Sequence, residues 1–248
     1  MEPLHWITER PFAHRGLHDA SSGIIENTGS AFLRALTAGY GIETDLQISA
    51  DGEAMVHHDD QLGRVTEGSG WLRELTSATL KTVRFRHGSD RMMTLGELCE
   101  LVSGGVPLLL ELKSHFDGDR RLVTRALEVL SGYSGAAALM SFDPSIVEHI
   151  RTLRPSFARG IVAERRYADA EWTRLSTREK RALSWMLHGF RTRPHFLAYS
   201  VKDLPSVAPF IARTILRLPL LTWTVRNESD RATAASWADQ IIFEGWRP

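Results

Sequence analysis

Hydrophobic and polar positions alternate along this chain in two regular ways. Short apolar or β-branched runs are followed by longer stretches in which apolar residues recur at i, i+3 and i+4. This alternation is typical of repeated βαβ units that build a parallel sheet. The runs predict eight strands, at residues 11–14, 41–48, 107–113, 137–142, 159–164, 196–201, 220–225 and 240–245.

The amphipathic stretches predict the helices that connect these strands. They fall at residues 28–38, 94–102, 120–130, 144–154, 177–188, 204–216 and 228–237. A (β/α)8 barrel, or TIM barrel, typically needs about 250 residues, and the chain has 248. The pattern therefore predicts an α/β protein with one TIM-barrel domain over residues 1–248.

Two segments fall outside this rhythm. The run AMVHHD at 54–59 follows the step Asp51-Gly52, which favours a tight turn, so we expect it to pair with 41–48 as a β-hairpin extension. Residues 60–93 are rich in glycine and polar residues, with one short helix expected near 77–84. We expect 60–93 to form a small insertion over the barrel mouth.

Composition narrows the class of protein. Thirty Lys and Arg balance thirty Asp and Glu, so no excess of positive charge favours nucleic acid as a partner. The one cysteine, Cys99, lies in a predicted helix and is expected to be buried as a small hydrophobe, which fits a reducing compartment. We find no secretory leader and no apolar run long enough to cross a bilayer, and expect a cytoplasmic protein.

Carboxylates gather at predicted strand ends. Side chains alternate along a strand, so Glu43 and Asp45 share one face, and Glu111 lies on the face of its strand that also carries Lys113. Catalytic residues of TIM barrels lie at the carboxyl ends of strands. Three clustered carboxylates raise one another's pKa unless a cation neutralises them, and oxygen ligands suit Ca²⁺ or Mg²⁺. We expect Glu43, Asp45 and Glu111 to bind one such ion.

The hairpin distinguishes two adjacent histidines. If the turn centres between Asp51 and Gly52, paired residues have numbers that sum to 103, which places His58 opposite Asp45 and turns His57 away. A slip by one residue would exchange the two histidines.

Several short motifs, taken in order, resemble the glycerophosphodiester phosphodiesterase family. They are AHRG (13–16), ENT followed by AF (26–32), GIETDLQISADG (41–52), HHDDQLGRVTEGSG (57–70), LELK (110–113), SFD (141–143) and TWTV (222–225). Each string is weak alone, but HRG, then ExD, then HD, then ExK form a specific combination. Two departures are Ile25, where the family often has proline, and 242–246, where it usually has Ile-Thr-Asp-x-Pro.

The resemblance implies a metal-dependent hydrolase of small phosphodiesters. Such an enzyme releases an alcohol and glycerol 3-phosphate, with one histidine accepting a proton and another donating one. Carried over by position, the implied roles are catalysis for His14 and His58, metal binding for Glu43, Asp45 and Glu111, and phosphate or substrate binding for Arg15, Lys113 and Trp223.

Other interpretations of the same residues stay open. The carboxylates could form structural ion pairs with Arg15, Arg64 and Lys113 without any metal. The reaction could be a lysophospholipase D or phospholipase C-like cleavage of a lipid phosphodiester, or the barrel could bind phosphodiesters without cleaving them. The alcohol released, the choice between Ca²⁺ and Mg²⁺, a cyclic phosphate intermediate and the oligomeric state stay open as well.

Overall fold

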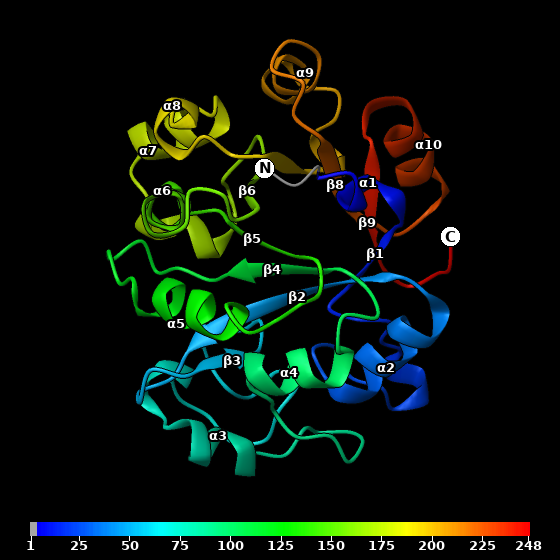
Figure 1. Ribbon diagram of the computed structural model, residues 1–248, viewed down its shortest axis with the longest axis vertical. Coiled ribbons are helices and arrows are strands. Elements are labelled where there is room, and N and C mark those ends of the chain that lie inside the picture. Colours follow the sequence, from blue (N-terminus) through cyan, green and yellow to red (C-terminus); the bar gives the residue numbers. More distant parts are fainter. Residues whose placement is uncertain (1–3) are drawn as a thin grey trace.

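Eight parallel strands close into a barrel in the computed structural model, which describes residues 4–248 apart from the side chains of residues 170 and 171. The strand order is β1-β9-β8-β7-β6-β5-β4-β2, and pairing between β1 and β2 completes the ring (Figure 1). The barrel strands are β1 (Phe12–His14), β2 (Gly41–Ile48), β4 (Leu108–Leu112), β5 (Ala137–Ser141), β6 (Arg159–Ala163), β7 (Phe196–Ser200), β8 (Leu220–Val225) and β9 (Gln240–Phe243). The predicted TIM barrel is confirmed.

Helices surround the barrel on its outside (Figure 1). The α-helices are α1 (Trp6–Glu9), α2 (Gly29–Ala38), α3 (Ser77–Thr82), α4 (Leu95–Val102), α5 (Arg121–Leu130), α6 (Pro144–Leu153), α7 (Thr177–Ser184), α8 (Gly189–Thr192), α9 (Val207–Thr214) and α10 (Glu228–Trp237). The 3₁₀ helices are η1 (Ala20–Ser22), η2 (Leu72–Glu74), η3 (Ala170–Arg174) and η4 (Val201–Asp203). Most of the predicted helices agree with these bounds.

Local side chains explain where the helices begin. Thr94 accepts a hydrogen bond from the backbone of Glu97, whose carboxylate accepts one in return, so a capping box starts α4. Asp143 caps α6, and Pro144 occupies the first helical position, where its missing N–H has no cost. The Asp143 cap directly follows β5 and fixes the direction in which the chain leaves the barrel there.

Two helices are shorter than predicted. The helix expected at 177–188 ends at Ser184, because Met186 adopts the left-handed φ of 51°, and the chain resumes as α8. The helix expected at 204–216 starts only at Val207, after Pro205, because a proline disfavours helical geometry in the residue before it. Both changes occur on the same side of the barrel.

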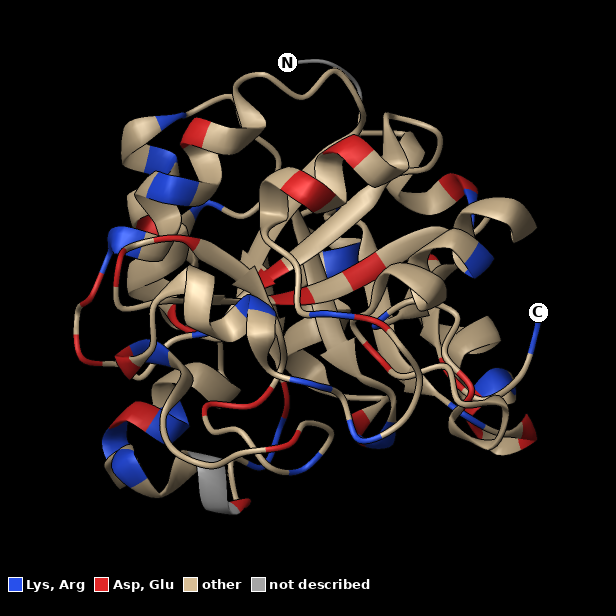
Figure 2. Cartoon of the chain, turned by 90° about the horizontal axis from the view of Figure 1, so that it is seen from below, with Lys and Arg blue, Asp and Glu red and all other residues tan. Residues whose placement is uncertain are grey.

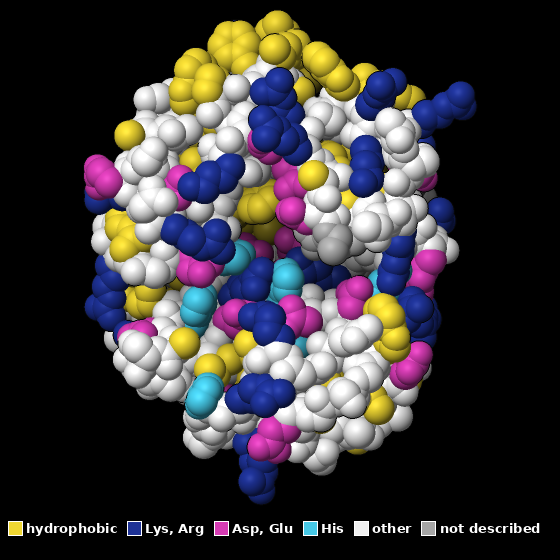
Figure 3. All heavy atoms as spheres, turned by 180° about the vertical axis from the view of Figure 1, so that it is seen from behind, with side chains coloured by type: hydrophobic (Ala, Val, Ile, Leu, Met, Phe, Trp, Pro, Cys, Tyr) yellow, Lys and Arg dark blue, Asp and Glu magenta, His cyan; other side chains and the backbone are white. Residues whose placement is uncertain are grey.

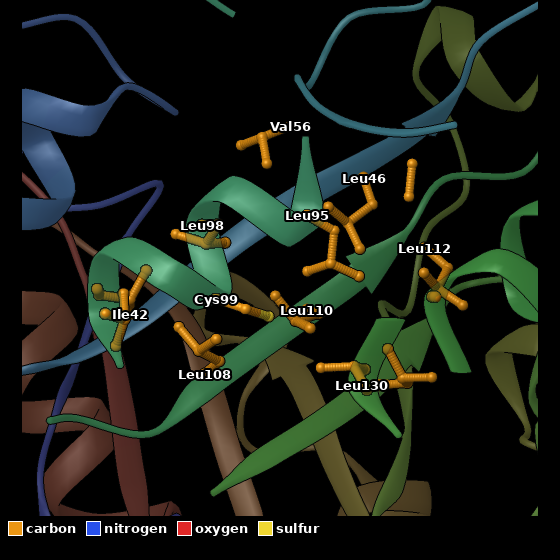
Figure 4. Close-up of a cluster of buried hydrophobic side chains, with 14 of the residues drawn as sticks. Ile42, Leu46, Val56, Leu95, Leu98, Cys99, Leu108, Leu110, Leu112 and Leu130 are labelled. Atoms are coloured by element: carbon orange, nitrogen blue, oxygen red, sulfur yellow. The ribbon is translucent and has the colours of Figure 1, made fainter. Parts of the chain in front are cut away.

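The strands present different faces to the helices and to the barrel interior. On β4, Leu108, Leu110 and Leu112 belong to the main hydrophobic core, where Leu108 and Leu110 lie beside Cys99 of α4 (Figure 4). Leu109 instead joins an interior cluster with residues of β5 to β9, such as Phe196. The same alternation directs the polar residues of β2 and β4 inward.

The hairpin strand β3 (Ala54–Val56) runs antiparallel to β2, as expected, but the predicted register is wrong by one residue. Leu46 pairs with Val56 and Ile48 with Ala54, so paired numbers sum to 102. The backbone N–H of Ser49 donates to Glu53 O, and Gly52 has a φ of 82°, so the loop has three residues rather than two. An odd loop length shifts the register by one.

The segment after β3 has a small hydrophobic core of its own. Met55 on β3 packs there with Leu62, Leu72, Leu80 and Met92. Cys99 on α4 is buried, as predicted. Within residues 4–248, the structure contains no helix with the length and apolar character that a membrane span requires.

Candidate active site

Three carboxylates meet inside the barrel at the end where the strands terminate. Asp45 on β2 pairs in register with Glu111 on β4, and Glu43 precedes Asp45 on the same inward face. One oxygen of each carboxylate lies within 4.8 Å of the others, and all three side chains are buried. Figure 2 shows acidic segments of neighbouring strands meeting near the centre of the molecule.

Two cations from the chain lie against this cluster. Lys113 Nζ lies 2.6 Å from Glu111 Oε1 and 2.9 Å from Asp45 Oδ1. Arg15 Nε lies 3.3 Å from Asp45 Oδ2. The backbone N–H of Arg15 donates to Glu43 Oε2 at 3.1 Å, a geometry that the left-handed φ of 56° at Arg15 permits. The carboxylates are therefore partly neutralised by the protein itself.

The pKa values of two of these buried carboxyls, Glu43 and Asp45, are shifted in opposite directions. Burial, together with repulsion from Asp45 and Glu111, raises the pKa of Glu43 well above its usual value. Burial would raise the pKa of Asp45 as well, but Lys113, His58 and Arg15 outweigh it and hold the pKa of that carboxyl well below its usual range. A further positive charge beside Glu43 would therefore stabilise its ionised form.

The donor set fits a divalent cation. Asp45 Oδ1 is buried and accepts no hydrogen bond, although Lys113 Nζ is near it. Buried polar atoms nearly always have a partner, and an oxygen without one indicates a group that the site would bind. Three carboxylate oxygens and no sulfur suit a hard ion such as Ca²⁺ or Mg²⁺ better than zinc. The identity of the ion stays a prediction.

His14 lies between the cluster and a fourth carboxylate. His14 Nδ1 is 2.6 Å from Glu244 Oε2, and His14 Nε2 is 4.0 Å from Glu43 Oε2. Burial would raise the pKa of Glu244, but the hydrogen bond from His14 and the ion pair with Arg226 outweigh it and hold that pKa well below its usual value. An ionised carboxylate can only accept, so Nδ1 of His14 carries the proton.

The charge state of His14 follows from its burial. Burial lowers the pKa of His14 to about 4, although the hydrogen bond to Glu244 opposes the shift. A neutral ring with a protonated Nδ1 directs the lone pair of Nε2 toward the carboxylates. His14 is therefore arranged to accept a proton.

His58 has a similar carboxylate partner. Its Nδ1 lies 2.8 Å from Asp59 Oδ1, and Arg64 Nε contacts the other oxygen of Asp59 at 2.7 Å. The preceding residue, His57, has the backbone bond expected of a residue opposite Asp45, since its N–H donates to Asp45 O at 3.0 Å. Its own ring is buried, and burial lowers the pKa of His57 to about 4.

The different orientations of His57 and His58 are therefore set by a turn and not by the alternation of faces along a strand. β3 ends at Val56, so the alternation of faces no longer decides where residues 57 and 58 point. The side chain of Gln47 donates to His58 O at 3.0 Å and fixes this turn. His58 faces the cavity, as expected, but not for the predicted reason.

Neutral and acidic neighbours hold the charged groups in place. Asn27 Nδ2 donates to Asp45 Oδ2 at 3.0 Å, and its oxygen accepts from Thr44 Oγ1 at 2.6 Å. Glu26 accepts from Arg15 Nη1 at 2.7 Å and from Arg64 Nη2. Burial alone would raise the pKa of Glu26, but these arginines lower it to about 2. Arg15 therefore has carboxylates on two sides.

A cavity of about 390 Å³ opens beside the carboxylates. Figure 3 shows a hollow on this face with histidine and charged side chains around it. One wall is polar and includes His58, Glu111, Lys113, His115 and Arg174. The other wall is aromatic and includes Phe116, Phe142 and Trp172. The cavity can thus accept an anionic group beside an apolar one.

The predicted site residues fall at different depths. His58, Glu111 and Lys113 line the cavity, whereas Glu43 and Asp45 are buried beneath it. Trp223 on β8 is half-buried and meets the cavity-lining Phe142 edge to face, with ring centroids 5.6 Å apart. A direct substrate contact for Trp223 stays a prediction.

Sequence reasoning missed two contributions. Glu244 follows β9, so a carboxylate at the carboxyl end of a barrel strand was the signal that could have identified it. Trp172 and Arg174 lie in η3, within the long connection from β6 to α7, where no periodic pattern marked them. Glu244 could therefore have been identified from the sequence, whereas Trp172 and Arg174 could not.

Comparison with known proteins supports this assignment of the fold. The model of the glycerophosphoryl diester phosphodiesterase family matches residues 14–244. A glycerophosphodiester phosphodiesterase of Caldanaerobacter subterraneus is 29% identical over 161 residues, which are 60% of this chain and 65% of that protein. Glycerophosphodiester phosphodiesterase 1 of Rattus norvegicus is 33% identical over 151 residues, covering 56% of this chain and 44% of its own length.

Solved structures agree on the fold. A phosphodiesterase of Oleispira antarctica, solved with the product sn-glycerol-3-phosphate, has a TM-score of 0.73 at 23% identity and covers 94% of this chain and 91% of its own. A glycerophosphodiester phosphodiesterase of Thermotoga maritima has a TM-score of 0.70 at 22% identity, covering 94% and 92%. The match to the curated Caldanaerobacter protein spans just under two thirds of that relative's length.

Proposed function

This chain belongs to the glycerophosphoryl diester phosphodiesterase family, and we propose that it hydrolyses small glycerophosphodiesters to an alcohol and glycerol 3-phosphate. The observation that carries the proposal is the cluster of Glu43, Asp45 and Glu111 within 4.8 Å of one another. His14 lies beside this cluster, and the 390 Å³ cavity opens next to it with His58 in its wall. The arrangement combines anion-binding, proton-accepting and proton-donating groups.

Glu43, Asp45 and Glu111 would hold one divalent cation, Ca²⁺ or Mg²⁺. Such an ion would polarise a phosphoryl oxygen and lower the pKa of a bound water or hydroxyl. Lys113 and Arg15 would then be freed in part from the carboxylates that they now contact at 2.6 to 3.3 Å. Both could then hold the phosphate and offset charge that develops on it.

His14 acts in this proposal as the proton acceptor. Its neutral ring, with Nδ1–H donated to Glu244 at 2.6 Å, leaves Nε2 free toward the carboxylates. Glu244 is a positioning residue, because it fixes the tautomer and the orientation of the ring without touching the substrate. A histidine in such a role typically contributes about 10²–10⁴-fold to the rate.

His58 acts as the proton donor to the leaving alcohol. The carboxylate of Asp59, with Oδ1 2.8 Å from His58 Nδ1, orients the ring. Its position in the cavity wall places it where a leaving group would depart. The two histidines therefore divide the proton transfers according to their surroundings.

Hydrolysis of glycerophosphocholine tests the proposal directly. We expect product only with Ca²⁺ or Mg²⁺, loss of activity in EDTA and recovery on adding the ion. His14→Ala and His58→Ala should each lower kcat/KM by about 10²-fold or more. His87→Ala, at an exposed position, is the matched control. Full activity in chelator, or in both site variants, would show that the carboxylates are structural ion pairs.

The aromatic wall favours a second substrate class for the same reaction. Phe116, Phe142 and Trp172 could pack against an acyl chain, as in a lysophospholipid. A comparison of kcat/KM for matched substrates with and without the acyl chain separates the two classes. Phosphodiester binding by calorimetry without turnover under any divalent ion would instead indicate a binding barrel.

A further inference from the structure

Exposed hydrophobic side chains gather on one face of the molecule, away from the catalytic cavity. Among the large hydrophobic residues recorded as exposed in the described part of the chain, only Leu33 and Leu153 lie outside residues 185–216. We call the rest the α7–α9 face; its exposed members are Trp185, Leu187, Phe190, Val207, Phe210, Ile211, Ile215 and Leu216. Figure 3 shows hydrophobic side chains at one edge of the molecule, where Figure 1 places α9.

The exposure on this face is high for residues of this size. Phe190 is 76% exposed, Ile215 69% and Leu187 64%. Single exposed apolar residues are ordinary on a protein surface, but a contiguous group marks a place where the protein meets something apolar. Leu187 and Phe190 follow the left-handed residue Met186, beyond the end of α7.

A groove runs between the two helical segments of this face. A cavity of about 590 Å³ lies among Trp185, Val207 and Phe210, and a second of about 210 Å³ lies among Trp185, Ile211 and Leu216. The two share Trp185 and Ala208 in their linings, so they are neighbours between the end of α7 and α9. Their walls are mainly apolar.

Basic residues border the same face. Arg165 and Arg166 line the larger cavity and are exposed. Residues 165–193 carry eight Lys or Arg against three Asp or Glu, in a chain that has thirty of each sign overall. The lining of the larger cavity includes Arg165 and Arg166 and no acidic residue, so positive charge lies beside the apolar groove.

We propose that the α7–α9 face docks on the surface of an anionic lipid bilayer. Exposed aromatic and aliphatic side chains that enter the boundary between headgroups and acyl chains, flanked by arginines that contact anionic headgroups, are the features of interfacial binding. A second copy of the chain fits less well, because a two-fold contact would place the arginines of both copies in one interface. The charge on the face thus selects an anionic partner over a copy.

The docking face is connected to the catalytic cavity through one segment. The connection from β6 to α7 contributes Trp172 and Arg174 to the cavity, and Arg165 and Arg166 to the docking face. A bilayer held at the arginines would therefore restrain the segment that forms one wall of the cavity. The proposal does not depend on the proposed function, since binding can be measured without turnover.

Vesicle co-sedimentation tests the docking surface. We expect the full chain to bind vesicles of phosphatidylcholine mixed with phosphatidylglycerol, and to bind phosphatidylcholine alone far more weakly. Phe190→Ser combined with Ile215→Ser should weaken binding by about tenfold or more, because two large apolar side chains no longer insert. Leu33→Ser, a change at an apolar residue that is 46% exposed on α2, is the matched control and should bind like the wild type.

Charge substitutions test the second half of the proposal. Arg165→Gln and Arg166→Gln should each weaken binding to the anionic vesicles by about fivefold, and added salt should reduce the difference. Equal binding by the Phe190→Ser/Ile215→Ser variant, or no binding to anionic vesicles at low salt, would overturn the proposal. A wild-type dimer in sedimentation equilibrium that this double variant dissociates would overturn it in favour of a second copy.

Discussion

The two sides of the barrel present different kinds of side chain to its interior. On the side of β1, β2 and β4 the inward residues near the mouth are charged, as with Glu43 and Glu111. On the side of β6 to β8 the inward residues are apolar, as with Val162 and Leu221. Buried charges rarely add net stability, whereas buried apolar side chains provide most of it. The charged side should therefore contribute to function, and the apolar side to stability.

The sharpest test of this division is Glu43→Gln. Because the pKa of Glu43 is raised by burial and by repulsion from Asp45, the charged form destabilises the folded protein at neutral pH. We expect kcat/KM to fall by about 10²–10³-fold, while the melting temperature stays the same or rises. A fall in melting temperature without loss of activity would contradict the comparison.

The converse change is Leu221→Ala on the apolar side. Leu221 is fully buried in the interior cluster, and truncation of such a leucine costs about 2–5 kcal/mol of unfolding free energy because it leaves a cavity. We expect kcat/KM well below the melting temperature to change by less than about threefold. Urea unfolding monitored by circular dichroism measures the loss, and Leu33→Ala at the exposed position is the control.

The Glu244→Gln variant tests whether Glu244, on the charged side, acts through His14. The hydrogen bond to Glu244 and its charge raise the pKa of His14, so the variant should lower kcat about tenfold and move the acidic limb of the pH profile to lower pH. KM should change little. The matched control is Arg226→Gln, which removes only the outer partner of Glu244, at 2.9 Å. Equal effects of the two variants would indicate a structural role.

The smallest effect is expected from a titratable group within the apolar side. Burial lowers the pKa of His188 from 6.5 to about 4. Between these two pH values the unfolded chain binds a proton that the folded chain does not, so His188 makes stability decrease as the pH falls through this window. Between pH 7 and pH 5 the melting temperature of His188→Met should fall by about 2–4 °C less than that of the wild type. His87→Gln, at an exposed position, should not change this dependence.

The same division explains what could be predicted from the sequence. The strands were predictable because their apolar runs are continuous, and the carboxylates could be brought together because alternation along β2 and β4 places Glu43, Asp45 and Glu111 on one face. Both rules act within a few residues of the chain. The break at Met186 was not predictable, since nothing in the local pattern distinguishes a left-handed residue inside a helical period.

Two parts of the site depend on geometry that local patterns do not contain. The hairpin register depends on whether the loop has two or three residues. The backbone hydrogen bond from Ser49 N–H to Glu53 O closes a loop of three residues. The partner of His14 is set by closure of the barrel, which brings Glu244 to it from the other end of the chain. Long-range pairing of this kind follows from the fold and not from spacing.

The contact between His14 and Glu244 also has a consequence for the order in which the protein becomes competent during synthesis. The two residues are 230 positions apart, and β9 joins β1 only when the last strand is available. A nascent chain that has emerged as far as residue 239 already carries both histidines and all three carboxylates of the cluster. It still lacks Glu244, whose Oε2 lies 2.6 Å from His14 Nδ1, so the orientation of His14 and the closure of the barrel both require β9.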